Sequence, residues 1–184
     1  MPVHRVHVDE SLHVAAGLCV LGVAVIEDAA EGQARADLRL LLPPGAQRLH
    51  WQQNGALLRG QAVGAVNRHV RQARAYLSYF DHPKRGDDAR ERCLVHMIGD
   101  LGGPPYEQIV IDRRSPHQDT RDDLVLGSQC QRLRLPHPPK WRHDGTLTEE
   151  LLWLADTICG AVSDHLVHGN PGYVQALAPK LVIV

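Results

Sequence analysis

The chain has 184 residues, of which 43% are hydrophobic and 22% are charged. This length and composition predict a single soluble globular domain over residues 1–184, and they exclude a disordered or fibrous chain. The formal net charge of -1 gives no global attraction to nucleic acid, so any such binding needs a local basic patch.

The four cysteines stand far apart in the sequence, and none forms a Cys-x-x-Cys pair, which argues against a thiolate zinc site. Cys19, Cys93 and Cys159 lie among apolar residues and are expected to be reduced core thiols. This cysteine pattern, with no recognisable secretory signal, predicts a cytoplasmic protein. The longest apolar run, residues 14–26, is shorter than the roughly 20 residues that cross a bilayer, so we expect no membrane span.

The first predicted element is a strand over residues 3–9, because apolar and polar side chains alternate there. The same alternation directs Asp9 and Glu10 to opposite faces, so only one of them can easily join a shared site. A turn at residues 11–13 leads into the apolar run 14–26, which we expect to be a strand covered on both faces.

The middle of the chain alternates between helical and strand-like segments, separated by proline- and glycine-rich turns. The predicted helices span residues 27–42, 55–69 and 87–101. The predicted strands span residues 70–80 and 107–112, and the second of them ends at Asp112.

In the last third we predict a charged loop at residues 113–127, a strand at 131–135 and a helix ending near His168. Thr146 and Glu149 have the spacing of a capping box for this helix. We interpret the tail, residues 173–184, as a docked edge segment. The first two strands are too close in sequence for a crossover, so they form an antiparallel hairpin. The fold class is therefore α/β, a mixed sheet with helices on its faces.

Three isolated acids lie beside strongly apolar segments: Asp9, Asp112 and Asp156. Each has an ordinary structural interpretation. Asp9 can cap a turn, Asp112 can begin one next to Arg113 and Arg114, and Asp156 can pair with an arginine or with backbone donors.

Taken together, the three carboxylates suggest a metal site. Converging carboxylates repel one another, and divalent cations between them remove that repulsion. Oxygen ligands favour Mg²⁺ or Mn²⁺ over zinc. Two such ions would activate a water and stabilise the leaving oxygen in phosphodiester hydrolysis. The hypothesis is a divalent-metal-dependent nuclease in which Asp9, Asp112 and Asp156 hold the metal.

Three motifs carry a family resemblance: Val-Asp-Glu-Ser at 8–11, Ile-Val-Ile-Asp-Arg at 109–113, and Leu-Trp-Leu-Ala-Asp-Thr-Ile-Cys-Gly-Ala-Val at 152–162. In this order they resemble an uncharacterised family of small bacterial proteins, a domain of unknown function with a ribonuclease H-like fold. The resemblance covers nearly the whole chain, although each motif is short. It implies a nuclease whose acidic metal-binding cluster is Asp9, Asp112 and Asp156, with Glu10 as the second acid of the catalytic motif.

The sequence departs from this pattern in one region that bears on catalysis. Ribonuclease H-like enzymes commonly carry another acid on the first long helix, whereas residues 50–69 contain three glutamines and no acid. Two alternatives therefore stay open. One is a non-catalytic nucleic-acid-binding or interaction protein with an incomplete site, and the other is a hydrolase of small nucleotides.

Basic residues and one tryptophan between residues 113 and 142 are candidates for binding a DNA or RNA backbone. They are Arg113, Arg114, Arg132, Arg134, Lys140, Trp141 and Arg142. Positive charge with one aromatic ring can follow phosphates and stack on a base. A solvated edge strand and loop would account for the same pattern equally well.

Overall fold

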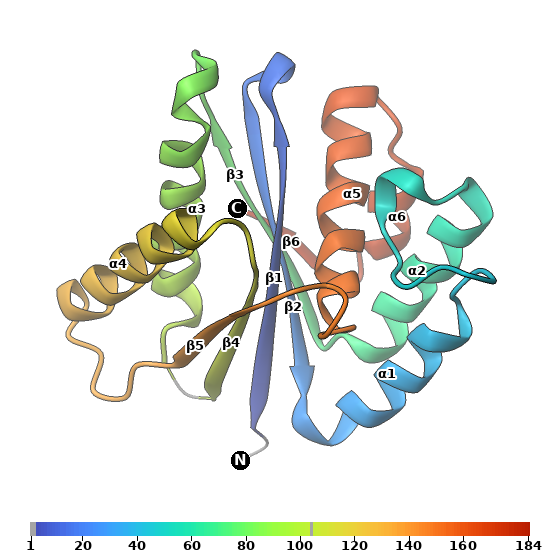
Figure 1. The fold of residues 1–184 in the computed structure, drawn as a ribbon, viewed down its shortest axis with the longest axis horizontal. Helices are drawn as coiled ribbons and strands as arrows, with labels where there is room; N and C mark the ends of the chain where they lie inside the picture. Colours follow the sequence, from blue (N-terminus) through green and yellow to red (C-terminus); the bar gives the residue numbers. More distant parts are fainter. Residues whose placement is uncertain (1–2, 104) are drawn as a thin grey trace.

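The computed structural model describes residues 3–103 and 105–184 and contains a six-stranded mixed sheet with helices on both faces (Figure 1). The strand order across the sheet is β5-β4-β1-β2-β3-β6. The strands are β1 (His4–His13), β2 (Leu18–Glu27), β3 (Gln72–Tyr79), β4 (Tyr106–Asp112), β5 (Lys140–Asp144) and β6 (Leu181–Ile183). The predicted α/β class with a mixed sheet is confirmed at this level.

Two layers of helices enclose the sheet. The helices are α1 (Glu31–Leu40), α2 (Ala56–His69), α3 (Gly86–Leu101), α4 (Pro116–Arg132), α5 (Leu152–His168) and α6 (Gly172–Leu177). Helices α3 and α4 cover one face, and α1, α2, α5 and α6 lie on the other (Figure 1). Short 3-10 turns occur at Val14–Ala16, Asp28–Ala30, Trp51–Gln53 and Pro83–Arg85.

Strand β1 connects the antiparallel and the parallel parts of the sheet. It pairs antiparallel with β2, as the predicted hairpin requires, and parallel with β4. Strand β3 pairs antiparallel with β2, whereas β5 lies parallel to β4 and β6 parallel to β3. The carboxyl ends of β1, β4 and β5 therefore meet at one edge of the sheet, which is where α/β proteins commonly bind ligands.

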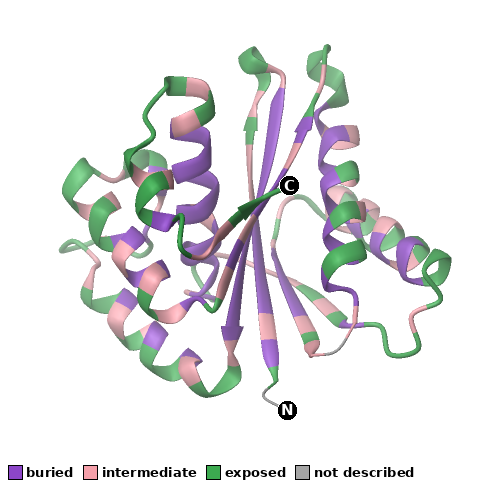
Figure 2. Cartoon of the chain, turned by 180° about the vertical axis from the view of Figure 1, so that it is seen from behind, coloured by how far each residue is buried: buried purple, intermediate pink, exposed green. Residues whose placement is uncertain are grey.

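The core lies on both sides of the central strands, which are buried along most of their length (Figure 2). Every residue of β2 except Glu27 is buried, as the uninterrupted apolar run predicted. One apolar cluster packs β2 and β3 against α2 and α5, and the other packs the sheet against α3. All four cysteines are buried and free, so the prediction of reduced core thiols is confirmed for Cys19, Cys93 and Cys159.

The boundary between the first two strands differs from the prediction. Strand β1 continues to His13, so Asp9 lies inside the strand and not at its end. The expected strand at 14–26 begins only at Leu18, because Gly17 adopts φ +60° and turns the chain. A side chain at Gly17 would also meet the carbonyl oxygen of Phe80 at 2.2 Å.

The largest error concerns residues 113–135, predicted as a loop and a strand. Helix α4 occupies most of this segment. Ser115 caps it by accepting a hydrogen bond from the Gln118 amide, and Pro116 occupies the first turn, where its missing N–H costs nothing. The buried residues of the helix, Asp122, Leu126, Gln129 and Cys130, recur at helical spacing. Because two of these four residues are polar, the hydropathy pattern does not show an apolar face at this spacing.

The start of α5 and the segment before it also differ from the prediction. The capping box is wrong, because α5 begins at Leu152 and Glu149 is engaged by Arg35 and Arg142. Residues 140–144, for which no element was predicted, form β5 at the sheet edge. In the tail, α6 precedes β6, and β6 pairs with β3 at the opposite edge.

Gly22 sets how closely α5 approaches the sheet. An added Cβ would lie 2.6 Å from the Ala155 carbonyl oxygen and 2.6 Å from the Cys159 Sγ. We expect Gly22→Ala to lower the free energy of unfolding by about 1–3 kcal/mol, because the helix must move away. Gly60→Ala, where nothing lies within 4 Å, should instead be neutral or stabilising. Chemical denaturation measures both, and equal stability of the two variants would contradict the close approach.

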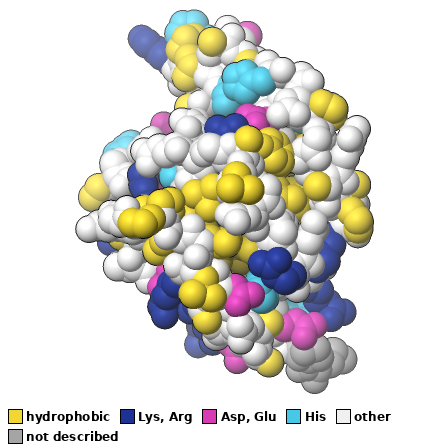
Figure 3. Space-filling model, turned by 90° about the vertical axis from the view of Figure 1, so that its right-hand side faces the viewer, with side chains coloured by type: hydrophobic (Ala, Val, Ile, Leu, Met, Phe, Trp, Pro, Cys, Tyr) yellow, Lys and Arg dark blue, Asp and Glu magenta, His cyan; other side chains and the backbone are white. Residues whose placement is uncertain are grey.

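The outer surface over the helices carries both apolar and charged side chains. On the face seen in Figure 3, apolar side chains gather in the middle, with charged and histidine side chains toward the ends. None of the helices in the described ranges combines the length and apolar character needed to cross a bilayer.

Candidate functional site

Asp9 and Asp112 lie side by side at the carboxyl edge of the parallel strands. The register pairs Val8 of β1 with Ile111 of β4, and each aspartate is the next residue along its strand. Neighbouring strands are about 4.8 Å apart, so the two carboxylates belong to one small region. Strand alternation places both on the face that α5 covers, opposite the apolar side chains of Val8 and Ile111.

Asp156 joins this region because α5 packs tightly over β1 and β2. The Cys159 thiol donates to the Asp9 carbonyl oxygen at 3.0 Å and accepts from the Gly22 amide at 2.9 Å. Gly22 is the partner of Asp9 in the β1–β2 register. Because Asp156 lies one turn before Cys159, its carboxylate is brought toward Asp9. The structure thus brings together the three acids predicted from the sequence.

The charges of these acids interact. Burial raises the pKa of Asp9 well above its usual value, and the negative charges of Asp156 and Asp112 raise it further. Burial also raises the pKa of Asp112 to about 6, against the opposing charges of Arg90 and Arg48. Like-charged carboxylates that disfavour each other's ionised form are typical of functional sites.

The segment before α2 orients Asp156, a role that the sequence did not reveal. The Trp51 amide donates to Asp156 Oδ2 at 2.7 Å, and His50 Nδ1 lies 3.4 Å from Asp156 Oδ1. The hydrogen bond with Asp156 raises the pKa of His50. The sequence context of His50, a short extended piece before a glycine-rich helix, carries no signal for this contact.

Glu10 faces the other side of the sheet, as strand alternation predicted. Its carboxylate pairs with Arg90, and Arg114 Nε lies 3.5 Å from Glu10 Oε1. Both arginines also bind the buried Asp122. Glu10 therefore belongs to an ion-pair network beneath α3 and α4, while the Glu10 amide donates to Asp9 Oδ1 at 2.7 Å.

The donor types fit a hard divalent cation, because Asp9, Asp112 and Asp156 offer only oxygen ligands. A buried carboxylate with a raised pKa is also a group whose charge a cation would compensate. The side chains do not form a finished coordination shell. Within residues 3–103 and 105–184, no three His, Cys, Asp or Glu side chains are arranged to hold one ion. The acids form a cluster with suitable chemistry and no assembled ligand geometry.

The predicted basic residues do not form one surface. Arg132 ends α4, and Arg134 lies just beyond it in a left-handed turn with φ +50°. Leu135, next to them, packs against Gly102, which precedes β4. Arg132 and Arg134 therefore lie toward the amino end of β4, away from the carboxylates.

Other basic side chains are occupied by structural pairs. Arg114 binds Asp87 and Asp122 at 3.0 Å and is largely buried. Arg142 pairs with Asp144 and Glu149, and the indole N–H of Trp141 donates to Asp123 at 2.9 Å.

Two exposed arginines lie near the acids, whereas Lys140 is exposed at the start of β5, beside Gln108 at the amino end of β4. Arg113 directly follows Asp112. Arg48, which the sequence did not single out, is exposed, and its charge lowers the pKa of both Asp9 and Asp112.

Comparisons with known proteins do not assign the chain to a family. No family model matches its sequence, and no curated protein is significantly similar to it.

Proposed function

We propose that the protein is a divalent-metal-dependent nuclease with a ribonuclease H-like fold, in which Asp9, Asp112 and Asp156 hold Mg²⁺ or Mn²⁺. The observation that carries the proposal is the meeting of these acids, from two neighbouring strands and one helix, at the carboxyl edge of the sheet. Burial and mutual repulsion raise the pKa of Asp9 there, and cations would relieve that repulsion.

Features of the fold support the same proposal. The family that the sequence resembles implies an antiparallel first hairpin in a mixed sheet with helices on both faces. Strands β1 and β2 form such a hairpin, β4 and β5 continue the sheet in parallel, and helices lie on both faces.

The residues of this chain would act by orientation and charge. The Glu10 and Trp51 amides hold one oxygen each of Asp9 and Asp156. Bound cations would supply an activated water and stabilise the leaving oxygen of a phosphodiester. Arg48 and Arg113, both exposed, are the cations we assign to attracting the phosphate backbone.

A non-catalytic nucleic-acid-binding protein is the second candidate, and two observations favour it. No assembled ligand set is present in the described residues, and α2 carries no acidic side chain. Calorimetric titration with Mg²⁺ and Mn²⁺ separates the candidates. No binding at millimolar metal would favour the non-catalytic protein.

Cleavage of labelled RNA and DNA with Mg²⁺, Mn²⁺ or EDTA tests the nuclease proposal directly. We expect wild type to cleave only with metal and Asp156→Asn to lose about 100-fold or more, because several kcal/mol of transition-state stabilisation disappear. Asp81→Asn is the matched control, since the Asp81 side chain is 80% exposed and remote in the sequence from the cluster. Equal activity of all three proteins, or no cleavage by any of them, would contradict the proposal.

A further inference from the structure

A cavity of about 380 Å³ lies beside Asp156 and extends along α5 as far as His168. Small-molecule sites usually measure roughly 300–1,000 Å³, so this volume suits a small ligand or one unit of a polymer. Its walls come from the last residues of β1, the segment before α2, and one face of α5. The cavity is thus continuous with one of the proposed metal ligands.

Two residues that line the cavity each carry a buried polar atom with no hydrogen-bond partner within the described ranges. The two atoms are the indole N–H of Trp51 and the hydroxyl of Ser163, in side chains of residues that are each 4% exposed. A buried donor without an acceptor costs about 1–3 kcal/mol, and proteins satisfy nearly all such groups. A ligand that presents acceptors to these two atoms would remove this cost.

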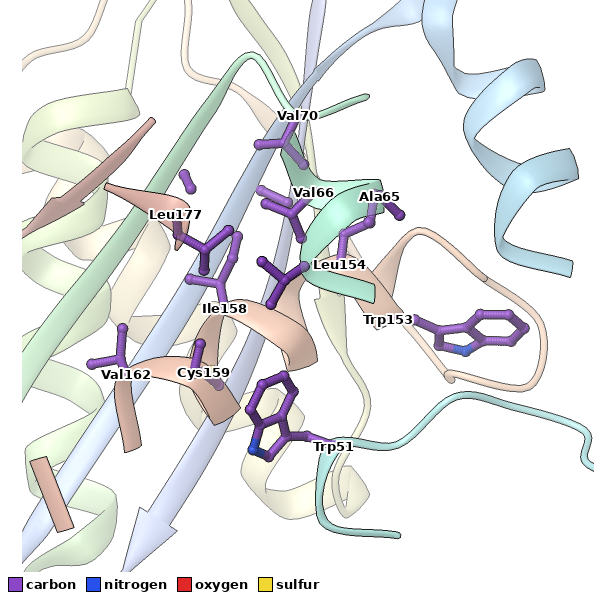
Figure 4. Packing of buried hydrophobic residues seen from close by; sticks show 14 of the residues in the cluster. Trp51, Ala65, Val66, Val70, Trp153, Leu154, Ile158, Cys159, Val162 and Leu177 are labelled. Carbon is purple, nitrogen blue, oxygen red and sulfur yellow. The ribbon is translucent and has the colours of Figure 1, made fainter. Parts of the chain in front are cut away.

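The position of Trp51 is fixed by its surroundings. A Cβ at Gly160 would lie 2.0 Å from the Trp51 ring, so the indole rests directly on α5. The Arg59 guanidinium stands 5.0 Å from the ring centroid, and the Tyr173 ring packs edge-on at 4.8 Å. Figure 4 shows the ring nitrogen turned away from the apolar cluster. The unpartnered N–H is therefore held in place before any ligand arrives.

The two ends of the cavity carry different side chains. Asp156 lies at one end, and α5 carries the wall onward to His168 at its carboxyl end. Arg59 lines the cavity while it pairs with Asp164 at 3.1 Å. Burial lowers the pKa of His13, and the charge of the nearby His168 lowers it further. A phosphate at this end would find N–H donors on Arg59, His13 and His168.

We propose that this cavity takes up one nucleotide unit, with its phosphate near His13 and His168 and its other end toward Asp156. The inference rests on the proposed function, because it places the neighbouring phosphodiester at the carboxylate cluster. The unit is either a free mononucleotide or the terminal nucleotide of a nucleic-acid chain. A 5′-phosphorylated dinucleotide distinguishes these two sources, because it should bind more tightly than a mononucleotide if the chain is the natural ligand.

The test follows the three tryptophan indole N–H signals in ¹⁵N NMR spectra of the full-length protein in EDTA. The probes are AMP, UMP, the 5′-phosphorylated dinucleotide, adenosine and inorganic phosphate. We expect the mononucleotides to shift the Trp51 signal to saturation. The signals of Trp141 and Trp153, whose N–H groups bind Asp123 and the Thr146 carbonyl, should stay in place. A Trp51→Phe variant identifies the signal of interest.

Two variants examine the walls of the cavity. Ser163→Leu should fill the cavity and abolish the Trp51 shift, whereas Ser128→Leu, at an exposed site on α4, should retain it. His168→Ala changes an exposed residue at the carboxyl end of α5. It should weaken mononucleotide binding by about two- to fivefold, as expected for an exposed ion pair, and leave adenosine binding unchanged.

The outcomes separate this inference from the nuclease proposal. If the wild-type protein cleaves nucleic acid but no nucleotide shifts its Trp51 signal, the cavity inference is overturned and the nuclease proposal stands. A saturating Trp51 shift in a protein that cleaves nothing would support the cavity as a nucleotide site and overturn the nuclease. Equal shifts of all three indole signals would overturn the cavity inference.

Discussion

Replacing Asp9 by Asn is expected to abolish metal-dependent cleavage and, in the metal-free protein, to increase the free energy of unfolding near neutral pH. Asp9 is 8% exposed and lies between the negative charges of Asp156 and Asp112. The amide keeps the size of the carboxylate and can still accept from the Glu10 amide, but it carries no charge. We expect cleavage to fall by about 100-fold or more and stability in EDTA to rise by roughly 1–3 kcal/mol.

The pH dependence gives the sign of this effect. The pKa values of Asp9 and Asp112 are higher in the folded than in the unfolded protein. Their contribution to stability is therefore complete below the unfolded pKa, near 3.9, and is lost as pH rises through the folded pKa, about 6 for Asp112. Asp112→Asn should match wild type near pH 4 and become the more stable protein as pH rises through about 6.

Urea denaturation in EDTA across this pH range measures both variants. The quantity to compare is the difference from wild type, because other groups titrate as well. Burial lowers the pKa of His7 to about 3, for example, so His7 reduces stability as pH falls below the pKa that this histidine has in the unfolded protein. With Mg²⁺ added, wild type should gain stability and Asp9→Asn should not. A variant less stable than wild type in EDTA at neutral pH would contradict the electrostatic account.

Local patterns predicted much of the fold because they report burial directly. The apolar run of β2, the hairpin and the largely apolar helix α5 each follow from side chains that must leave water. Helix α4 was missed because Asp122 and Gln129 stand where a hydrophobic stripe was sought. Asp122 is buried because Arg90 and Arg114 reach it from α3 and from the segment after β4, and such pairing is not visible in a one-dimensional pattern.

The candidate site was predictable to a similar extent. Asp9, Asp112 and Asp156 could be selected because each is an isolated acid next to apolar residues, and the parallel pairing of β1 with β4 brings two of them together. The contacts of His50 and Trp51 with Asp156 join parts of the chain about a hundred residues apart and leave no local trace. The basic run was overestimated, because a count of charges does not show that Arg114 and Arg142 are already paired.

The second large effect is expected at Arg90, which is 2% exposed between the sheet and α4. Its guanidinium binds Asp122, itself 1% exposed, at 2.8 Å and also pairs with Glu10. Arg90→Met should lower the free energy of unfolding by about 3–5 kcal/mol, because it leaves Asp122 buried with only Arg114 as a partner. Arg121→Met is the matched control on α4, where a partly exposed arginine pairs with Asp88 and Glu91 and should contribute under about 1 kcal/mol.

A double variant separates the cost of an unpaired charge from the loss of packing at Arg90. Arg90→Met combined with Asp122→Leu removes both charges, so it should be more stable than Arg90→Met alone. Equal losses for Arg90→Met and Arg121→Met in urea denaturation would show that the buried network contributes no more than a surface pair.

Arg90 also connects stability to the site, because its positive charge lowers the pKa of both Asp9 and Asp112. Removing that charge should raise both pKa values, so the acids would ionise and accept cations only at higher pH. The pH profile of cleavage by Arg90→Met should therefore move to higher pH, measured at a temperature where the variant is folded. A merely structural role would lower the amount of folded enzyme and leave the profile where it is in wild type. Under the proposed function, Arg90 would thus have two separable roles, one in folding and one in setting the pH at which the acidic cluster binds metal.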